Sequence, residues 1–413
     1  MNAGLILSMN PKAAMLRLND QVYLVSGAAK DCLYDLSHQK LWHIGKDTSA
    51  LIRRCVTEPG DSFSNDEQAV IAQLTQADLL TEGCGEIPDI RELRQIRKPR
   101  AAWIEVCTVC NLRCIHCYNG TQRQIFMSAS DFRQVCEKLA DYGIRSVQLI
   151  GGEPLCHPDF CNLLQTAKAS FAVVELYTNG TLLTDAVCVA LRQADAAVSL
   201  SVYSYESEMH DAVTGINGSH WETERALSLL RQYGIPHHTN AVRMKHIRIG
   251  ARGSKPYQLD TRADIVRMSG KGSLSLLDST LLREKCITKE TFRHPLRPGR
   301  VASAVSGNPC FSRKIYVAAD LNVYPCVMER RIRHGSLRNR TLADVLSPAV
   351  LGLNKDQVSG CRDCEFRYAC PDCRPDSLSD SPAAKPYYCT YDEQRGIWQD
   401  PEAFISALLK ESE

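Results

Sequence analysis

Apolar and polar positions follow two different periods along the chain, and their order predicts an α/β protein. From residue 101 to about 244, strand-like apolar runs alternate with segments whose apolar residues recur at helical spacing. The segment after Ser128 is the clearest helix, because Ser128 can cap its start and Gly143 can end it. The expected strands are 101–106, 146–150, 173–177, 196–202 and 239–244, and the other expected helices are 160–169, 185–193 and 221–233.

Strands that alternate with helices in this way predict parallel β/α units. Their number fits a partial (β/α)6 barrel of the TIM type, in which chemistry lies at the C-terminal ends of the strands. A last β/α element is expected near Ile265. The rest of 250–300, rich in Arg, Lys, Gly and Ser, is expected to form loops and a bridge.

The segments on either side of this region have other patterns. Residues 1–95 combine strand-like runs at 15–18, 22–25 and 41–44 with helical patterns at 49–56 and 65–80, which suggests a small α+β unit of winged-helix type. Pro88 and Pro99 mark 86–100 as a connector. Residues 301–400 are cysteine-rich, with a short helix at 341–346, and an amphipathic helix is expected at 401–409. The predicted domains are therefore 1–95, 96–300, 301–400 and a terminal helix in 401–413.

Composition narrows the functional classes. The 413 residues hold 49 basic and 47 acidic side chains, and this balance argues against nucleic acid as the main partner. No apolar run approaches the ~18 residues of a membrane-spanning helix. The start of the chain has one apolar patch, Leu5 to Leu7, and no cleavable signal pattern. We therefore expect a cytoplasmic protein that does not bind membranes.

Nineteen cysteines are the strongest chemical signal. In a reducing compartment metal ligation explains clustered cysteines better than disulfides do. Ten cysteines form two groups with ligand-like spacing. Several of the others stand singly in apolar-periodic segments and are expected to be buried small hydrophobes; they include Cys32, Cys55, Cys84, Cys136, Cys161 and Cys188.

The first group, Cys110, Cys114 and Cys117, directly follows the first predicted barrel strand. Three thiolates on one tight loop can hold three corners of a cubane iron–sulfur cluster, which leaves one iron open to a small molecule. A zinc site would need a fourth ligand. His116, inside the segment, has poor geometry for that role, and Cys107 lies on the strand and is interpreted as core.

The spacing C-x3-C-x2-C resembles the signature of the radical S-adenosylmethionine (SAM) superfamily. The segment Gly151-Gly152-Glu153-Pro154, at the end of the second strand, is similar to the family's GGEP motif. The resemblance implies that a [4Fe–4S] cluster binds and cleaves SAM, and that the resulting 5′-deoxyadenosyl radical takes a hydrogen from substrate. It further implies a set of SAM-contacting residues: Tyr118, Gly151, Gly152, Glu153, Pro154, Thr178, Asn179, Ser199 and Ser201.

The second group resembles a SPASM domain, a C-terminal extension that carries auxiliary [4Fe–4S] clusters. It departs from that pattern at Leu321, where glycine is usual, and in the x2 spacing before Cys373. By this resemblance one auxiliary cluster is held by Cys361, Cys364, Cys370 and Cys389, and a second by Cys310, Cys326 and Cys373. Cys286 is a candidate fourth ligand of the second cluster, and a site left open to substrate is the alternative. Zinc-ribbon sites are the alternative to both clusters.

Enzymes similar to this pattern modify peptides, which implies a ribosomally made precursor peptide as substrate and a C–C cyclophane, a thioether or an epimerised residue as product. Residues 1–95 would bind the leader by adding it as a strand to a sheet edge, and flavodoxin or ferredoxin would supply electrons. Alternatives are a sulfatase-type or cofactor-precursor maturase and a non-catalytic iron–sulfur or zinc module. No general acid or base is identified, although four residues near strand ends could face the cavity: Tyr203, Tyr205, His237 and His238.

Overall fold

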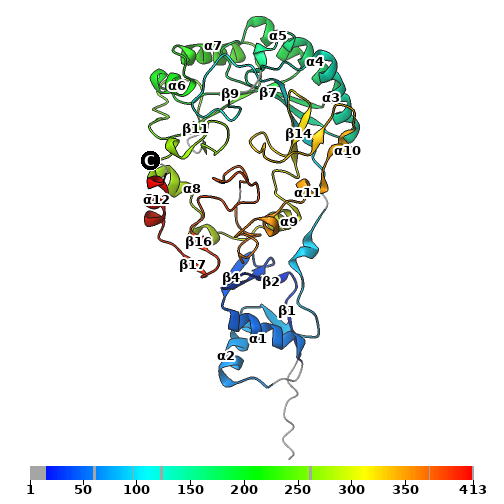
Figure 1. Ribbon diagram of the computed structural model, residues 1–413, viewed down its shortest axis with the longest axis vertical. Coiled ribbons are helices and arrows are strands. Elements are labelled where there is room, and N and C mark those ends of the chain that lie inside the picture. Colours follow the sequence, from blue (N-terminus) through cyan, green and yellow to red (C-terminus); the bar gives the residue numbers. More distant parts are fainter. Residues whose placement is uncertain are drawn as a thin grey trace, which may run out of the picture.

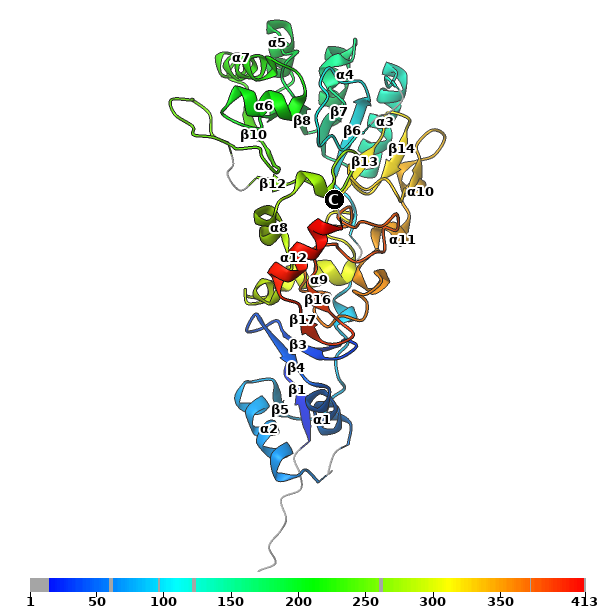
Figure 2. The same ribbon diagram turned by 60° about the vertical axis from the view of Figure 1, so that its left-hand side comes forward.

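The computed structural model describes residues 15–58, 62–95, 97–120, 124–259, 263–371 and 373–411. In both views of the ribbon the molecule is elongated: the N-terminal unit lies at one end, the β/α region at the other, and much of the C-terminal region between them (Figures 1 and 2). The apolar patch at 5–7, on which the expectation of no signal segment rests, lies outside the described residues. In the part of the chain that the structure describes, no helix is long and apolar enough to cross a membrane.

The N-terminal unit joins a three-stranded antiparallel sheet to two helices and a small strand pair. The sheet has the order β2-β3-β4, and β1 pairs with β5. The apolar side of α1 faces the sheet, and there Ile52 is buried in one cluster with Leu33 and Leu80. The elements are β1 (Leu16–Leu18), β2 (Val22–Ser26), β3 (Asp31–Asp35), β4 (Lys40–Ile44), α1 (Lys46–Thr57), α2 (Asn65–Gln76) and β5 (Leu80–Glu82).

Two features of this unit differ from the prediction. The helix expected to reach Leu80 ends at Gln76, because Asp78 adopts a left-handed backbone (φ 59°) and the chain then turns into β5. β3 was not expected, since every one of its residues is buried and it therefore has no polar alternation to reveal a strand. α2 begins with a capping box between Ser64 and Glu67.

The β/α region confirms the parallel prediction for five strands. Its strands run in the order β6-β7-β8-β9-β10, each parallel to its neighbour. Figure 1 shows the helices along the outer side of this sheet. The elements are β6 (Ala101–Cys107), α3 (Ala129–Tyr142), β7 (Ser146–Gly151), α4 (Phe160–Ser170), β8 (Val173–Thr178), α5 (Asp185–Gln193), β9 (Ala197–Ser201), α6 (Ser207–Thr214), α7 (Ser219–Gln232) and β10 (His237–Asn240).

The predicted ends of α3 are confirmed. The Ser128 side chain accepts a hydrogen bond from the Asp131 amide, and Gly143 takes the left-handed conformation (φ 100°) that ends many helices. The apolar side of α3 buries Phe132 and Leu139 in the core between helices and sheet. The cap and the apolar stripe thus set the helix bounds and orientation together.

A strand is present where the last β/α element was expected, near Ile265, but it lies outside the main sheet. The strand pattern at 239–244 breaks at Ala241, and β11 (Val242–Arg243) leaves the main sheet to pair with β12 (Asp264–Ile265). On the other side of β6 the main sheet continues into the C-terminal region, through β13 (Lys314–Val317), β14 (Asn322–Tyr324) and β15 (Gly335–Ser336). The sheet therefore stays open between β10 and β15.

The hairpin between β13 and β14 closes tightly although Leu321 replaces the usual glycine. Leu321 has φ 73°, a backbone that costs a non-glycine residue about 1–2 kcal/mol. Its amide donates to the Ala318 carbonyl (2.8 Å), and its side chain is buried in the main core. Burial of this side chain offsets the backbone cost, so the turn is tight in spite of this departure from the usual glycine.

Short elements complete the C-terminal region and the bridge to it. α12 packs on α8, where Arg283 and Glu402 form a paired contact (2.6 Å). The helices and strands are α8 (Ser279–Lys285), α9 (Pro298–Ser306), α10 (Leu342–Val345), α11 (Pro348–Leu351), β16 (Tyr391–Asp392), β17 (Ile397–Trp398) and α12 (Pro401–Lys410). The 3-10 turns are η1 (Ile90–Leu93), η2 (Pro154–Cys156), η3 (Leu274–Leu276), η4 (Lys289–Phe292) and η5 (Lys355–Gln357).

The N-terminal sheet and the C-terminal cysteine region share one buried interface. Glu365, fully buried, accepts hydrogen bonds from the His43 ring (2.7 Å) and the Tyr391 hydroxyl, and its carbonyl accepts one from the Tyr34 hydroxyl (2.9 Å). Tyr34 and Phe366 belong to the same apolar cluster. The side chain of Glu365 is thus the polar centre of an otherwise apolar contact between the two regions.

Replacing Glu365 with alanine should destabilise the protein by on the order of 3 kcal/mol, because His43 and Tyr391 would lose their buried acceptor. The urea midpoint of unfolding measures this loss. The matched control is Glu290→Ala, since Glu290 is exposed and faces Arg293 at 3.4 Å; it should stay within about 0.5 kcal/mol of the parent. Equal midpoints for the two variants would contradict the assigned role of Glu365.

Candidate functional site

The loop from Cys110 to Cys117 lies at the carboxyl end of β6 and is anchored by backbone hydrogen bonds. The amides of Arg113 and Ile115 donate to the carbonyls of Thr214 and Val213 (2.8 and 3.0 Å), at the end of α6. The Cys117 carbonyl accepts from the Lys271 amide (2.9 Å). These contacts from two distant segments hold the loop in one conformation.

The three thiols of this loop differ in exposure. Cys110 lies at the surface, and Cys114 and Cys117 are half-buried. Burial raises the pKa of the Cys114 thiol to about 11. A thiolate in such surroundings needs a cation as partner, and an iron corner of a cluster supplies one.

Glycine is required at the end of β7 because the cysteine loop crosses it closely. A Cβ on Gly151 would lie 2.4 Å from the Cys107 carbonyl oxygen, and one on Gly152 would lie 2.4 Å from the Val109 oxygen. The Glu153 amide donates to the Val109 carbonyl (2.7 Å). The two segments that the sequence singled out therefore meet in direct backbone contact.

Glu153 is the centre of a buried polar cluster. Its carboxylate accepts from the Thr178 hydroxyl (2.6 Å), the Asn179 amide (2.8 Å) and the Leu155 amide (3.1 Å). Burial nevertheless raises the pKa of Glu153 from 4.5 to about 7, although these three bonds lower it. Pro154 starts the short turn η2 directly beside this cluster. The structure thus brings Glu153, Pro154, Thr178 and Asn179 together.

The raised pKa of Glu153 predicts a pH effect on stability. Between pH 4.5 and about 7 the folded chain keeps a proton that the unfolded chain has released, so the free energy of unfolding falls as pH rises through this window. The full change is on the order of 3 kcal/mol. Urea unfolding at several pH values, without SAM, should show this slope in the parent and lose it in Glu153→Gln. Parallel pH profiles of parent and variant would contradict the prediction.

The other predicted SAM contacts are held by bonds of their own. The Tyr118 hydroxyl donates to the Gly151 carbonyl (3.0 Å), which ties the cysteine loop to β7 once more. Ser199 is buried and accepts from the Asn240 side-chain amide on β10. Ser201, half-buried, is the last residue of β9. Tyr118 thus lies beside the cysteine loop, and Ser199 is already bonded within the sheet.

One residue of this site, Asn111, was not singled out from the sequence, and two that were, His116 and Tyr203, make a contact that the sequence did not indicate. Asn111, inside the cysteine spacer, accepts from the Asn179 side chain (3.0 Å) and donates to Thr181 (2.7 Å). The His116 ring packs edge-on against Tyr203 (5.0 Å between centroids), and its Nδ1 is buried with no hydrogen-bond partner among the described residues. Burial lowers the pKa of His116 to about 4, so the ring is neutral. The side chain of Asn111 could have been noticed from its place in the spacer; the Tyr203 contact could not.

The two faces of the parallel sheet differ in polarity. Alternate residues of β7, β8 and β9 enter the helix-covered core. The residues between them lie on the opposite, inner face, where Gln148 donates to Glu175 (2.6 Å) and His238 lies 3.7 Å from the same carboxylate. The prediction that His238 faces inward is supported, whereas Tyr205 stacks on Tyr257 and accepts from the Leu259 amide (2.6 Å), which makes it a packing residue.

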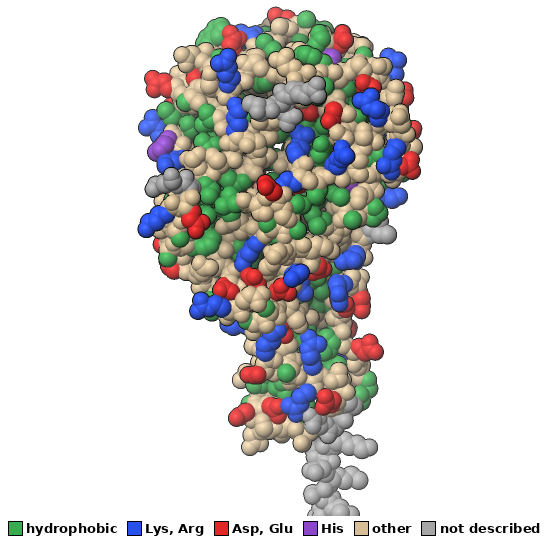
Figure 3. All heavy atoms as spheres, in the orientation of Figure 1, with side chains coloured by type: hydrophobic (Ala, Val, Ile, Leu, Met, Phe, Trp, Pro, Cys, Tyr) green, Lys and Arg blue, Asp and Glu red, His purple; other side chains and the backbone are tan. Residues whose placement is uncertain are grey.

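A wide cavity of 810 Å³ opens beside the cysteine loop. One wall is Tyr118 to Gly120, and the facing walls come from 268–275, 328–331 and 375–380. This volume lies within the range of about 300–1,000 Å³ typical of ligand clefts. The cavity therefore joins the edge of the parallel sheet to the C-terminal cysteine region. Figure 3 shows the upper body hollowed on the face in view.

The second cysteine group is partly assembled in the structure. The pKa of the Cys364 thiol is raised, first by burial and also by neighbouring Cys370 and Cys389. Burial also raises the pKa of the Cys326 thiol, and Cys310 raises it further. Cys286 is the candidate extra ligand for Cys310, Cys326 and Cys373, but the cysteine that raises its pKa, after burial, is Cys389.

The donor chemistry of this region fits iron–sulfur clusters. Cations lie beside the thiols, since Arg267 interacts with Cys373 and Lys385 with Cys389 and Cys361. No three His, Cys, Asp or Glu side chains in the described ranges are grouped so that they could hold a single metal ion. Thiols are the donors that iron–sulfur clusters take, and they are also zinc ligands.

Two isolated cysteines are not buried as expected. Cys84 is exposed after β5, where its sulfur lies 3.1 Å from that of Met15, and Cys161 is exposed on α4. Cys161 stands on the side of α4 away from its buried residues, and Cys84 lies beyond the end of β5. Cys107, interpreted as core, is buried and donates to the Glu153 carbonyl (3.2 Å). The prediction is confirmed for four more: Cys32, Cys55, Cys136 and Cys188.

Comparison with known proteins assigns a class to this site. Residues 104–247 match the Radical SAM superfamily. This segment begins in β6 and contains the cysteine loop, the Gly151–Pro154 turn and strands β7 to β11. The chain therefore contains a radical SAM domain, and the resemblance noted from the sequence is confirmed for that part. Such a domain implies a [4Fe–4S] cluster and SAM.

Curated relatives share low sequence identity with this chain, and only over part of its length. The chain is 30% identical over 161 residues to the antilisterial bacteriocin subtilosin biosynthesis protein AlbA of Bacillus subtilis, which covers 38% of this chain and 34% of AlbA. It is 27% identical over 247 residues to mycofactocin maturase MftC of Mycobacterium ulcerans, covering 54% of this chain and 66% of MftC. The matched part thus spans between a third and two thirds of these relatives.

Solved structures share the fold at low identity. A structure of anSMEcpe with bound AdoMet superposes with a TM-score of 0.53 at 20% identity, covering 70% of this chain and 94% of that one. The Streptococcus suis protein SuiB bound to S-adenosylmethionine gives a TM-score of 0.51 at 14% identity, covering 90% of this chain and 99% of SuiB. The α/β fold with its central parallel sheet is therefore established.

Proposed function

We propose that this protein is a radical SAM enzyme that modifies a ribosomally made precursor peptide. The observation that carries the proposal is a cavity of 810 Å³, one wall of which, Tyr118 to Gly120, directly follows the cysteine loop at the carboxyl edge of the sheet. The names of the relatives point the same way: AlbA is a bacteriocin biosynthesis protein and MftC a maturase. The oxidative product would be a C–C cyclophane, a thioether crosslink or an epimerised residue.

The residues of the chain would divide the work in the following way. Cys110, Cys114 and Cys117 would hold a [4Fe–4S] cluster with one open iron, and Glu153 would bind the SAM amino group. When bound, the cluster supplies the electron that cleaves SAM to a 5′-deoxyadenosyl radical. The buried carboxylate of Glu153, with its three donors, keeps one orientation, as an amine site requires.

The second cysteine group would form a SPASM-type domain with two auxiliary [4Fe–4S] clusters. Segments of the same C-terminal region, 328–331 and 375–380, line the cavity, which supports a role for the clusters in accepting an electron from the substrate after hydrogen removal. One ligand set would be Cys361, Cys364, Cys370 and Cys389, and the other Cys310, Cys326 and Cys373. The neighbourhood of Cys364, Cys370 and Cys389 supports the first set.

Residues 1–95 would bind the leader of the precursor as a winged-helix-like recognition unit, and the domain bounds would be 1–95, 96–300, 301–400 and 401–413. Flavodoxin or ferredoxin would reduce the first cluster in the cytoplasm. The superposition with SuiB extends over 90% of this chain, which supports a shared arrangement of regions. It gives no support for a shared substrate.

A sulfatase-type maturase is the second candidate, favoured by the likeness in fold to anSMEcpe, which has also been solved with AdoMet and the Kp18Cys peptide (TM-score 0.52, 18% identity). The experiment that separates the candidates uses anaerobically reconstituted protein, SAM, dithionite and a short precursor encoded beside the gene. Loss of two hydrogens from the peptide indicates a crosslink. Uptake of deuterium from D2O with no other change in mass indicates epimerisation. Either result supports the proposal. SAM cleavage with an unchanged peptide contradicts it, and no cleavage at all favours a non-catalytic module.

A further inference from the structure

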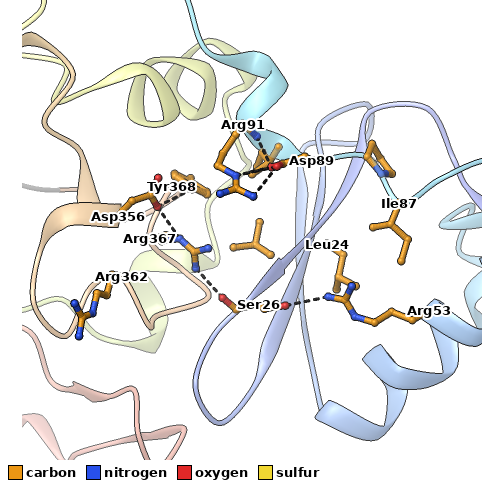
Figure 4. A pocket seen from close by; sticks show the side chains of 13 residues that line it. Leu24, Ser26, Arg53, Ile87, Asp89, Arg91, Asp356, Arg362, Arg367 and Tyr368 are labelled. Atoms are coloured by element: carbon orange, nitrogen blue, oxygen red, sulfur yellow. Dashed lines mark hydrogen bonds and ion pairs between the residues drawn. The ribbon is translucent and has the colours of Figure 1, made fainter. Parts of the chain in front are cut away.

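A second cleft, of 420 Å³, lies between the N-terminal unit and the C-terminal cysteine region (Figure 4). One wall is the β2 strand, from Leu24 to Ser26, and another is the connector from Ile87 to Arg91. The third wall comes from the segment between Asp356 and Tyr368. None of the cysteines assigned above lines the cleft, although Cys361 and Cys364 lie within the segment that forms its third wall.

The wall formed by β2 is an unpaired sheet edge. Among the residues that the structure describes, β2 pairs only with β3, in the sheet order β2-β3-β4. The Gly27 amide donates to the Lys30 carbonyl and the Leu36 amide to the Gln21 carbonyl, both at 3.0 Å. Since antiparallel pairs alternate between bonded and non-bonded, residues 21, 23, 25 and 27 face β3, and the backbone groups of Leu24 and Ser26 face outward.

These outward groups offer one free donor–acceptor pair to a ligand. Neither the amide nor the carbonyl of Leu24 bonds to any described residue. The Ser26 carbonyl is occupied by the Arg367 guanidinium (2.8 Å). An added strand would therefore pair with Leu24, and Arg367 would mark its end.

The charge of the cleft selects the kind of strand. Four guanidinium groups line it, from Arg53, Arg91, Arg362 and Arg367, against the two carboxylates of Asp89 and Asp356. Asp89 is paired with Arg91 (2.7 Å) and Asp356 with Arg367 (3.1 Å). Exposed Asp363, 3.3 Å from Arg362, still leaves an excess of positive charge. Arg53 donates to the Ser26 hydroxyl (3.1 Å), as Figure 4 shows.

The apolar part of the lining is divided between the two sides of the sheet edge. Leu24 and Ile87 belong to the apolar cluster that includes Ile52 of α1, the helix that carries Arg53, and Ile90 belongs to the cluster of Tyr368, which follows Arg367. Because successive side chains of a strand point to opposite sides, each side of a bound strand can meet an arginine beside an apolar group. An occupant that combines acidic and apolar residues matches this lining.

We propose that this cleft binds an acidic, extended segment of the precursor peptide, added to the free edge of β2 with its carboxylates toward Arg53 and Arg362. The proposal rests on the peptide substrate proposed above, and deepens it by naming the chemistry and place of recognition. Main-chain pairing at Leu24 supplies affinity, and the arginines supply selection for acidic residues.

The test is fluorescence anisotropy on the full-length reconstituted protein with a fluorescein-labelled decapeptide of alternating Glu and Val. Binding is expected for this probe and at least tenfold weaker for the Lys–Val counterpart. The double variant Arg53→Ala, Arg362→Ala should bind the acidic probe at least tenfold more weakly. Arg293→Ala, which removes an exposed arginine outside the cleft, should bind like the parent.

Backbone N-methylation of the probe tests strand pairing separately from charge. In an added strand, alternate amides face β2 and the others face away. Methylation of the amides that face β2 should abolish binding, and methylation of the others should leave it unchanged. Equal binding of both methylated probes, displacement by inorganic phosphate at equal charge concentration, or an unaffected double variant would each overturn the proposal.

The outcome is separable from that of the proposed function. Modification of a precursor by protein whose cleft does not bind the acidic probe would refute the cleft and leave the function standing. Binding of the probe by a protein that modifies no precursor would refute the function and leave the cleft standing.

Discussion

Replacement of Cys110, Cys114 and Cys117 together by alanine is expected to lower formation of 5′-deoxyadenosine from SAM by at least about a thousandfold, since enzymes commonly accelerate reactions by ~10⁶ or more. The loop has no other thiol, so the cluster of the radical SAM domain would lose its three protein ligands at once. Chromatography of the products under dithionite measures the rate, and the iron content after reconstitution should fall by the share of one cluster.

Cys161→Ala is the matched control, because Cys161 is an exposed thiol of the same domain on α4. It should keep both the iron content and the rate. SAM scission that persists in the triple variant, with iron content unchanged, would disprove the placement of the cluster on this loop.

Gly152→Ala adds a single methyl group, and we expect this addition to destabilise the protein more than any other in the β/α region. A Cβ there would lie 2.4 Å from the Val109 carbonyl oxygen and 2.5 Å from that of Thr108. Both atoms are backbone, so relief requires the cysteine loop itself to move. We expect a loss of about 2–3 kcal/mol in the free energy of unfolding, and at least tenfold weaker SAM binding because the loop and Glu153 move apart.

The control for this variant is Gly299→Ala, in the first turn of α9, where no atom lies within 4 Å of the added Cβ. It should be neutral or stabilising by up to about 1 kcal/mol, since alanine favours the helix and restricts the unfolded chain. Urea midpoints and SAM titration measure both variants. Similar midpoints for the two alanine variants would show that the contact at Gly152 is relieved at no cost.

Local patterns predicted most of the β/α region, because its elements depend on neighbours in sequence. α5 was expected at 185–193 and spans those residues, and the capped start and glycine end of α3 are where they were expected. Elements whose existence depends on distant partners were missed. α6 is short, and its end is tied to the cysteine loop through the Thr214 and Val213 carbonyls.

The ligand motif was visible without a structure because cysteine spacing and the Gly-Gly-Glu-Pro turn are local. The reason for the two glycines was not visible, since it lies in the crossing of two loops about 40 residues apart. The same holds for the bond between Asn111 and Asn179 and for the ring contact of His116 with Tyr203.

By itself, the sequence determined the parallel α/β class, the position of the three-cysteine loop after the first strand of that region, and the superfamily that this loop indicates. Periodicity and spacing carry that information because they act over a few residues. Only the tertiary structure decided that β13 rather than a sixth barrel strand extends the sheet at β6, that Glu365 joins two regions, and that an arginine-lined cleft faces the free edge of β2. Those features depend on contacts between segments that no local pattern encodes.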